Sequence, residues 1–489
     1  MSSSSPIVIL DIGASKVQCL VGETEASGDC KILGMGISPC RGIRRSVVID
    51  MPRVVESIRT AVAEAERSAG LRITGAYAGI AGQDVQAHSS RSAVAISGSS
   101  EPIDERDVER ALAAAEQAAP PAQAIALHRF IQSYAVDGEP VQNPLWLHGH
   151  KLEVETLSAT ASEHACTTLE RAAEEAGVSI VGFLAESVAA ASAMLNTDER
   201  EMGVGLLDIG AGTCDLALYH GSLQHLAEIP FGGQDITRDL SMVLNISPRE
   251  AEQLKCEHGG VCTDETEADE ALTFRTTAGR THTILREQLD AIIEARQQEI
   301  LEFVGREIDR SGYGQQLAAG LVFTGGGAML RNVDRLGEEV LGIPVRIGEP
   351  SEIIAPDAVK SPASATAVGL LRFASDSATE LAPTMESSGA GPSRFLDRVA
   401  RLFSFLDFLD SKAASLRCVG RAARFWSSAT SRPRLASSSC CSSMALHAAG
   451  GSTRTSSIFA ISARMLSRSG SLAPASRSMV SWVSSTSLA

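Results

Sequence analysis

Apolar strands that end in an aspartate and a turn of small residues occur twice in the chain. In the first stretch, residues 7–10 (IVIL) lead to Asp11, and a second strand follows the turn. In the second stretch, residues 204–207 (VGLL) lead to Asp208, and a second strand follows at 215–219. A strand, a tight glycine-rich turn and another strand predict a β-hairpin. Two such hairpins in the same order predict a duplicated fold.

The spacing of apolar residues around the first hairpin predicts one α/β half. Residues 32–38 predict a further strand, 51–69 have the apolar spacing of a helix, and 73–80 predict a buried strand. Asp50 is placed to cap the helix, and Gly70 is placed to end it. The predicted order is three strands, a helix and a strand.

Residues 83–161 interrupt this order and predict a separate small unit. Alternating apolar and polar positions indicate strands over 85–96, 124–136 and 151–159. A helix with an acidic start is predicted over 103–117, where acidic side chains favour the helix dipole. We expect a small α+β subdomain inserted in the first half.

The second half combines its hairpin with several predicted helices. Helical spacing covers 235–244, and a capping box that contains a proline predicts another helix at 247–255. A long helical stretch is predicted over 283–310, and a strand at 345–347. A last helix at 361–371 is expected to return to the first half, which would then be discontinuous in sequence.

The chain changes in composition after residue 373. Residues 374–393 are rich in Ser, Ala, Thr, Gly and Pro, which is typical of a flexible tether. Residues 394–409 predict a short amphipathic basic helix, the pattern of an interfacial membrane anchor, with a partner-docking helix as the alternative. Its apolar face and flanking arginines are Phe395, Leu396, Val399, Leu402, Phe403, Leu406, Arg394, Arg398 and Arg401.

Residues 410–489 are unlike the acidic body of the chain. No Asp or Glu follows Asp410, whereas Arg, Ser and Ala are abundant. We assign no fold to this tail, because its residues show no period. Two interpretations stay open: translation of GC-rich DNA out of frame, or a basic disordered extension that reinforces binding to anionic lipid.

Charge and composition narrow the class of protein. The formal net charge of −16 argues against a general nucleic-acid-binding protein. Ten scattered cysteines and a start without a charged-then-apolar signal pattern predict a cytoplasmic protein. No apolar run is long enough to span a membrane. Cys256, His258 and Cys262 lie close together, but no second ligand pair follows at zinc spacing.

The glycine-rich turns suit phosphate oxygens, because small residues leave backbone N–H groups accessible. Asp11 and Asp208 are suited to hold Mg²⁺ through oxygen ligands. A third glycine element after a strand leads into a helical start, which favours an anion or a polar group. The spacing differs from the Walker loop and the Rossmann fingerprint. The candidate binding residues are Gly13, Ala14, Ser15, Lys16, Gly210, Ala211, Gly212, Thr213, Gly325, Gly326, Gly327 and Ala328.

These three elements resemble the phosphate 1, phosphate 2 and adenosine motifs of the actin, Hsp70 and sugar-kinase superfamily. The matching stretches are 11–16, 208–213 and 325–328. Within the superfamily, residues 6–405 are most similar to the FtsA family of bacterial cell-division proteins. The resemblance implies ATP and Mg²⁺ as ligands, clamped between two halves, and at most a weak or regulatory ATPase activity.

The resemblance also implies roles for three further side chains. Glu186 precedes a small-residue helix, where the superfamily has a Glu that helps to place the water or the metal. The alternative is that Glu186 only stabilises the helix start, by about 0.3–1 kcal/mol. Glu252 and Lys255 resemble the pair that contacts ribose and adenine, with a surface salt bridge as the alternative. Lys16 is either a phosphate ligand or a surface lysine at a strand start.

The predicted fold is α/β: an actin-like ATPase fold of two duplicated halves, with an inserted SHS2-like subdomain (1C) and a C-terminal amphipathic helix. The expected boundaries are 1–83, 163–202 and the return helix 361–373 for subdomain 1A, 84–162 for 1C, 203–236 and 315–360 for 2A, 237–314 for 2B, 374–393 for the linker, 394–409 for the membrane-targeting helix and 410–489 for the tail.

The resemblance implies a division protein that polymerises at the cytoplasmic face of the inner membrane and tethers FtsZ at the septum. Its expected partners are the FtsZ C-terminal peptide through 2B, copies of itself, other division proteins through 1C and an anionic membrane surface, but no nucleic acid. A type IV pilus scaffold of the PilM type and a metabolite kinase stay open as alternatives. An Hsp70-like chaperone is disfavoured, because no β-sandwich substrate domain follows.

Overall fold

The computed structural model describes residues 6–24, 30–82, 85–96, 102–116, 123–262, 268–350 and 353–380. The amphipathic helix expected at 394–409 and the tail at 410–489 lie outside the described residues. Among the residues described, no helix combines the length and apolar character needed to cross a membrane.

The first half contains a six-stranded sheet in the order β11-β6-β1-β2-β3-β19. β1 and β2 form an antiparallel hairpin, and β6 runs parallel to β1. α1 packs its apolar face on this sheet, with Asp50 capping its start and Gly70 ending it in the left-handed conformation. The bounds are β1 (Ile7–Ile12), β2 (Lys16–Thr24), β3 (Cys30–Pro39), β4 (Ile43–Arg44), β5 (Val47–Val48), α1 (Met51–Ala69), β6 (Gly75–Ile80), α3 (Glu163–Ala176), β11 (Ser179–Ala185) and β19 (Ile353–Ile354).

The second half repeats this construction in a five-stranded sheet of order β14-β13-β12-β17-β18. β12 and β13 form the hairpin, and β17 runs parallel to β12 as β6 does to β1. The two halves are therefore a structural duplication, as the repeated hairpin predicts. The bounds are α5 (Thr197–Met202), β12 (Val204–Ile209), β13 (Cys214–His220), β14 (Ser222–Ile229), β17 (Leu321–Thr324) and β18 (Val345–Ile347).

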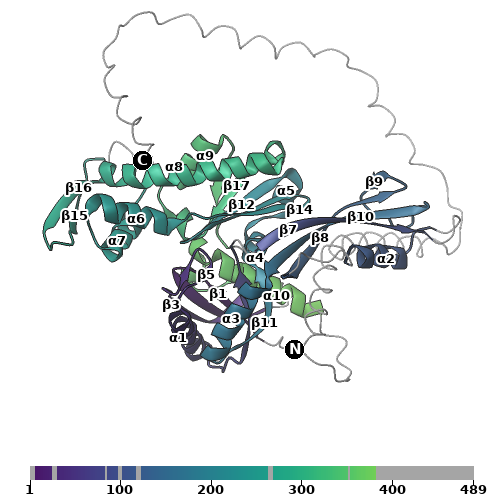
Figure 1. The fold of residues 1–489 in the computed structure, drawn as a ribbon, viewed down its shortest axis with the longest axis horizontal. Helices are drawn as coiled ribbons and strands as arrows, with labels where there is room; N and C mark the ends of the chain where they lie inside the picture. Colours follow the sequence, from purple (N-terminus) through teal and green to yellow (C-terminus); the bar gives the residue numbers. More distant parts are fainter. Residues whose placement is uncertain are drawn as a thin grey trace, which may run out of the picture. The chain divides into compact units, whose positions relative to one another are not determined.

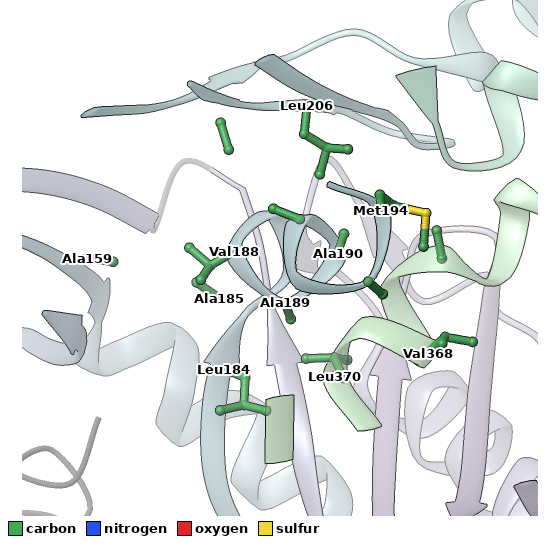
Figure 2. Close-up of a cluster of buried hydrophobic side chains, with 14 of the residues drawn as sticks. Ala159, Leu184, Ala185, Val188, Ala189, Ala190, Met194, Leu206, Val368 and Leu370 are labelled. Atoms are coloured by element: carbon green, nitrogen blue, oxygen red, sulfur yellow. The ribbon is translucent and has the colours of Figure 1, made fainter. Parts of the chain in front are cut away.

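Two helices rich in small residues pack where the halves meet (Figure 1). Gly369 of α10 approaches α4 so closely that a Cβ there would lie 2.2 Å from the carbonyl oxygen of Ala189. Leu184 of the first sheet and Leu206 of the second belong to the same buried cluster (Figure 2). This core thus joins both halves. α4 spans Glu186–Met194, and α10 spans Ala365–Glu380, continuing into residues expected to belong to the linker.

The inserted unit has its own four-stranded sheet, in the order β7-β10-β8-β9, with α2 packed against it (Figure 1). Ile103, Val108 and Leu152 are buried in its separate small core. Apolar and polar residues alternate along these strands because one face of the sheet packs on α2. The bounds are β7 (Val85–Ala95), α2 (Glu105–Glu116), β8 (Ala124–Val136), β9 (Glu139–Val141) and β10 (Lys151–Ser162).

A helical region follows the second hairpin and contains the long helix α8 (Figure 1). The expected start of this helix at residue 283 is wrong, because 283–285 belong to a strand. Ile284 pairs with Leu272 across a short hairpin, and this cross-strand pairing outweighs the helical spacing. The bounds are α6 (Gly233–Leu244), α7 (Pro248–His258), β15 (Ala271–Arg275), β16 (Thr281–Leu285), α8 (Arg286–Ser311), η1 (Gly314–Gln316), η2 (Gly326–Met329), α9 (Val333–Leu341), η3 (Asp357–Val359) and η4 (Pro362–Ser364).

Candidate nucleotide-binding cavity

The turns of the two main hairpins have the same backbone construction. Gly13 N donates to Lys16 O at 3.0 Å, and Gly210 N donates to Thr213 O at 2.9 Å. In each turn the strand-ending aspartate stands two positions before the glycine. The local sequence explains both turns, because a small residue at the bend leaves the tip free of bulky side chains.

A cavity of about 450 Å³ lies where the two turns meet. The third glycine element also lines this cavity. Gly325 has φ +82° and packs so closely on Asp208 that a Cβ there would lie 2.2 Å from Asp208 Oδ1. Ala328 is buried and is not among the described residues of the wall. The other residues predicted to bind the nucleotide or the metal all line the cavity: Asp11, Gly13, Ala14, Ser15, Lys16, Glu186, Asp208, Gly210, Ala211, Gly212, Thr213, Glu252, Lys255, Gly325, Gly326 and Gly327.

Four carboxyl groups are concentrated in the wall of this cavity. Burial, together with the charge of Asp208, raises the pKa of Asp11 to about 6. Burial and then the neighbouring acids raise the pKa of Glu186 well above its usual value, and burial also raises that of Asp208. The pKa of Asp215 rises to about 8 for the same two reasons. Their raised pKa values favour the neutral forms, and a bound cation would favour the ionised forms. Among the residues described, no group of three or more His, Cys, Asp or Glu side chains is arranged to hold a metal ion by itself.

Two hydrogen bonds connect this wall of the cavity to the first turn of α10 and to the residues just before it. Thr366 Oγ1 donates to Asp208 Oδ2 at 2.6 Å, which lowers the pKa of Asp208 against the larger effect of burial. Lys16 Nζ donates to Ala363 O at 2.6 Å and to Gln18 Oε1 at 2.9 Å. The lysine is half-buried in the cavity wall, where its ammonium group is available to an anion if it exchanges these partners.

The predicted ribose and adenine pair lies on the α6–α7 side of the cavity. Lys255 Nζ donates to Glu252 Oε2 at 2.8 Å and to Gly233 O at 2.9 Å. Burial by itself would raise the pKa of Glu252, but the Lys255 ammonium and hydrogen bonds from Lys255 and Thr237 hold it below its usual value. The pair therefore forms the salt bridge of the alternative reading while it also lines the cavity.

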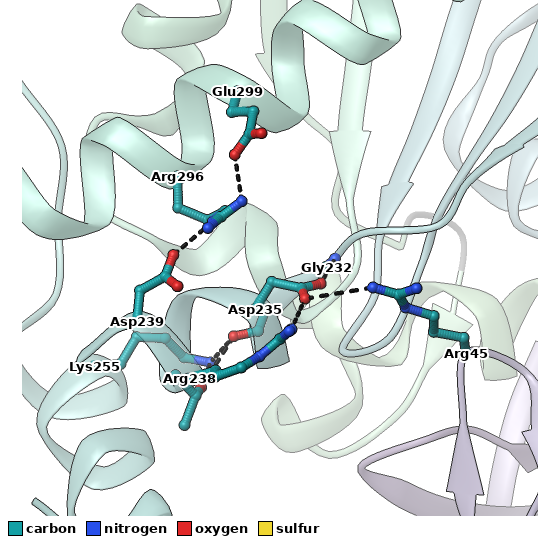
Figure 3. Close-up of polar contacts among 10 residues, drawn as sticks. Arg45, Gly232, Asp235, Arg238, Asp239, Lys255, Arg296 and Glu299 are labelled. Carbon is teal, nitrogen blue, oxygen red and sulfur yellow. Dashed lines mark hydrogen bonds and ion pairs between the residues drawn. The ribbon is translucent and has the colours of Figure 1, made fainter. Parts of the chain in front are cut away.

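Polar contacts link the two halves beside the second turn (Figure 3). Arg45, between β4 and β5 of the first half, lies 3.8 Å from Asp235 of the second half. Its guanidinium also lies over the ring of Phe231, 5.5 Å from the ring centre. Asp235 accepts a further hydrogen bond from Gly232 N at 3.0 Å and pairs with Arg238. Arg45 thus spans the halves at the edge of the cavity.

Sequence reasoning missed four residues of this region. Asp215 lies inside the second hairpin motif, directly opposite Asp208 in the sheet. Its position in this motif would have allowed its prediction as a site residue. Thr366, Arg45 and Gln297 lie far from the glycine turns in sequence. No local pattern connects these three residues to the cavity.

Comparisons with known proteins bear on the family and the fold of the chain. A family model described as "Cell division protein FtsA" matches residues 205–369, and one described as "SHS2 domain inserted in FTSA" matches residues 82–160. A solved structure of a PilM–PilN type IV pilus biogenesis complex has a TM-score of 0.50 at 18% identity, covering 76% of this chain and 98% of that one. The duplicated halves and the inserted subdomain define an actin-like ATPase fold with an SHS2 insertion.

Sequence relatives identify the family within this class. The cell division protein FtsA of Pseudomonas aeruginosa is 35% identical over 377 residues, which cover 76% of this chain and 90% of the relative. That of Escherichia coli strain K12 is 32% identical over 382 residues, with coverage of 76% and 90%. The chain belongs to the FtsA family of cell-division proteins.

Proposed function

We propose that this chain binds ATP with Mg²⁺ in the cavity and uses the nucleotide to control assembly into an actin-like polymer. The observation that carries this proposal is the pair of matched aspartate–glycine turns, one from each half, in the wall of a single cavity. Backbone N–H groups of such turns are suited to phosphate oxygens.

The residues present fit both ligands. Mg²⁺ prefers carboxylate and water oxygens. Asp11 is buried in the cavity wall, and Asp208, Asp215 and Glu186 are partly buried there. Asp11 and Asp208 would hold the ion, which would neutralise phosphate charge. The three glycine elements would surround the phosphates and the nucleoside, while Glu252 and Lys255 lie where a ribose and base would be held.

Hydrolysis would be slow and regulatory. Glu186 stands at the start of α4, beside the two aspartates, and would orient a water molecule toward the terminal phosphate. Burial favours the neutral form of Glu186 over its carboxylate. Nucleotide held from both sides would fix the angle between the halves, and this angle would determine how copies join head to tail.

The role in division follows from family membership. We infer that the polymer lies on the cytoplasmic face of the inner membrane at the division site, where the 394–409 segment would bind anionic lipid. Region 237–314 would receive the C-terminal peptide of FtsZ, and the SHS2 insert would contact neighbouring copies and other division proteins. The alternative pilus role is supported only by the fold of the PilM–PilN complex, which is 18% identical in sequence. The FtsA of Pseudomonas aeruginosa is 35% identical.

Asp208→Ala tests the nucleotide assignment. The substitution removes one of the two strand-end carboxylates and leaves Thr366 without its acceptor, so ATP binding in the presence of Mg²⁺ should be lost. Titration calorimetry of the full chain measures the affinity. Asp198→Ala, which removes an exposed acid on α5, is the control and should bind as the parent does. Unchanged ATP affinity in Asp208→Ala would contradict the phosphate-turn assignment.

A further inference from the structure

Gln297 is a buried polar residue in the cavity wall. It lies on α8, has 0% exposure and lines the cavity. Neither its amide nitrogen nor its amide oxygen has a hydrogen-bond partner within the part of the chain that the structure describes. A buried amide in this state is destabilising, so it calls for a partner that arrives with a ligand.

The neighbours of Gln297 place it on the helical side of the cavity. One turn earlier on α8, Ile293 packs against Gly259, at the end of α7. The preceding residue, Arg296, pairs with Asp239 of α6, and Figure 3 shows this contact near Lys255. α6 and α7 carry the candidate nucleoside contacts, whereas the carboxylates come mainly from the two sheets. Gln297 is thus associated with the nucleoside end rather than the phosphate end.

We propose that Gln297 is a specificity-determining residue that hydrogen-bonds the polar edge of the adenine base. The inference rests on the proposed ATP binding and adds the group that recognises the base. A carboxamide presents a donor and an acceptor side by side, and adenine offers an amine donor beside a ring-nitrogen acceptor. The purine 6-amino group would thus supply the partner that the amide oxygen lacks.

The test compares ATP with purine riboside triphosphate, which lacks only the 6-amino group. The parent chain should bind ATP about tenfold more tightly, the effect of one satisfied buried hydrogen bond. Gln297→Met, similar in size but without a donor or acceptor, should bind both nucleotides equally. Gln298→Met, at the exposed neighbouring position, should keep the parent preference. Titration calorimetry with Mg²⁺ measures the affinities of these three proteins for the two nucleotides.

Three outcomes are informative. If the parent binds both nucleotides equally, or if Gln297→Met keeps the tenfold preference, the role of Gln297 is overturned while ATP binding stands. If the parent binds neither nucleotide, the proposed function itself fails. Gln297→Leu is the second variant, and thermal unfolding checks that both apolar variants fold; loss of an unpartnered buried amide should leave stability equal or higher.

Discussion

At the residue scale, the fold buries ionisable groups whose protonation affects stability. His128 of β8 is one of them, in the inserted unit. Its Nε2 accepts a hydrogen bond from Ala185 N at 3.0 Å, and its ring packs edge-on against Phe373 at 5.0 Å. Ala185 immediately precedes Glu186, so this contact anchors the insert to the start of α4 beside the candidate site.

His128 should make the chain less stable in acid. Burial lowers the pKa of His128 to about 3, so the folded protein keeps it neutral while the unfolded chain binds a proton below about 6.5. Stability attributable to this group is full above the unfolded pKa and is lost as pH falls toward 3. Between pH 7 and pH 5 the loss is about 2 kcal/mol.

Urea unfolding of the parent and of His128→Gln at both pH values measures this effect. Glutamine retains an acceptor oxygen for Ala185 N but does not titrate, so the variant should lose about 2 kcal/mol less on acidification. The cavity carboxyl groups with raised pKa values are present in both proteins. Their contribution to the pH dependence of stability therefore cancels when the two proteins are compared. An identical pH response in the two chains would refute the assignment.

At the element scale, the short β4–β5 hairpin connects the halves. Its two turn residues, Arg45 and Ser46, have φ of 47° and 60°, a conformation that non-glycine residues adopt at a cost. The turn places Arg45 beside Asp235 and over Phe231, and Ser46 in the cavity wall. The hairpin is therefore placed to stabilise a closed arrangement of the two halves.

Arg45→Ala should speed the release of bound nucleotide. Loss of a half-buried ion pair and a cation–π contact corresponds to roughly 1 kcal/mol, or about fivefold in the dissociation rate. Stopped-flow release of a fluorescent ATP analogue measures the rate. Arg44→Ala, at the exposed position next to it, is the matched control. Equal release rates for the two variants would contradict the proposal that this hairpin stabilises a closed arrangement of the two halves.

At the scale of the whole molecule, the proposed function depends on parts that act together. The body would hold the nucleotide, and the segment at 394–409 would bring that body to the membrane. The strong negative charge of the chain would oppose binding to anionic lipid without such a basic segment. Membrane association is therefore a test of the C-terminal region.

Co-sedimentation with anionic liposomes and FtsZ should separate the full chain from one that ends at Pro392. The full chain should pellet with the vesicles and carry FtsZ with it, while the shortened chain should stay in the supernatant. Phe403→Glu in the full chain keeps the tail and charges the apolar face of the predicted helix, so it should also stay unbound. Equal pelleting of all three proteins would exclude the anchor.

Much of the fold was predictable because its signals are local. The aspartate–glycine turns at Asp11 and Asp208 require small residues at the bend, and the chain shows them directly. Asp50 and Gly70 mark the ends of α1 by capping chemistry that involves only neighbouring residues. The start of α8 was misplaced because Ile284 is held by a partner on another strand.

The sequence by itself determined the duplicated strand–turn–strand units, the glycine-rich tips and the carboxylates at the strand ends, since each depends on residues within one turn of the chain. Only the tertiary structure decided that Thr366 bonds Asp208, that Arg45 reaches Asp235 and that Gln297 enters the cavity wall. These contacts join segments far apart in sequence, and they depend on how the sheets and helices pack, which no local pattern encodes.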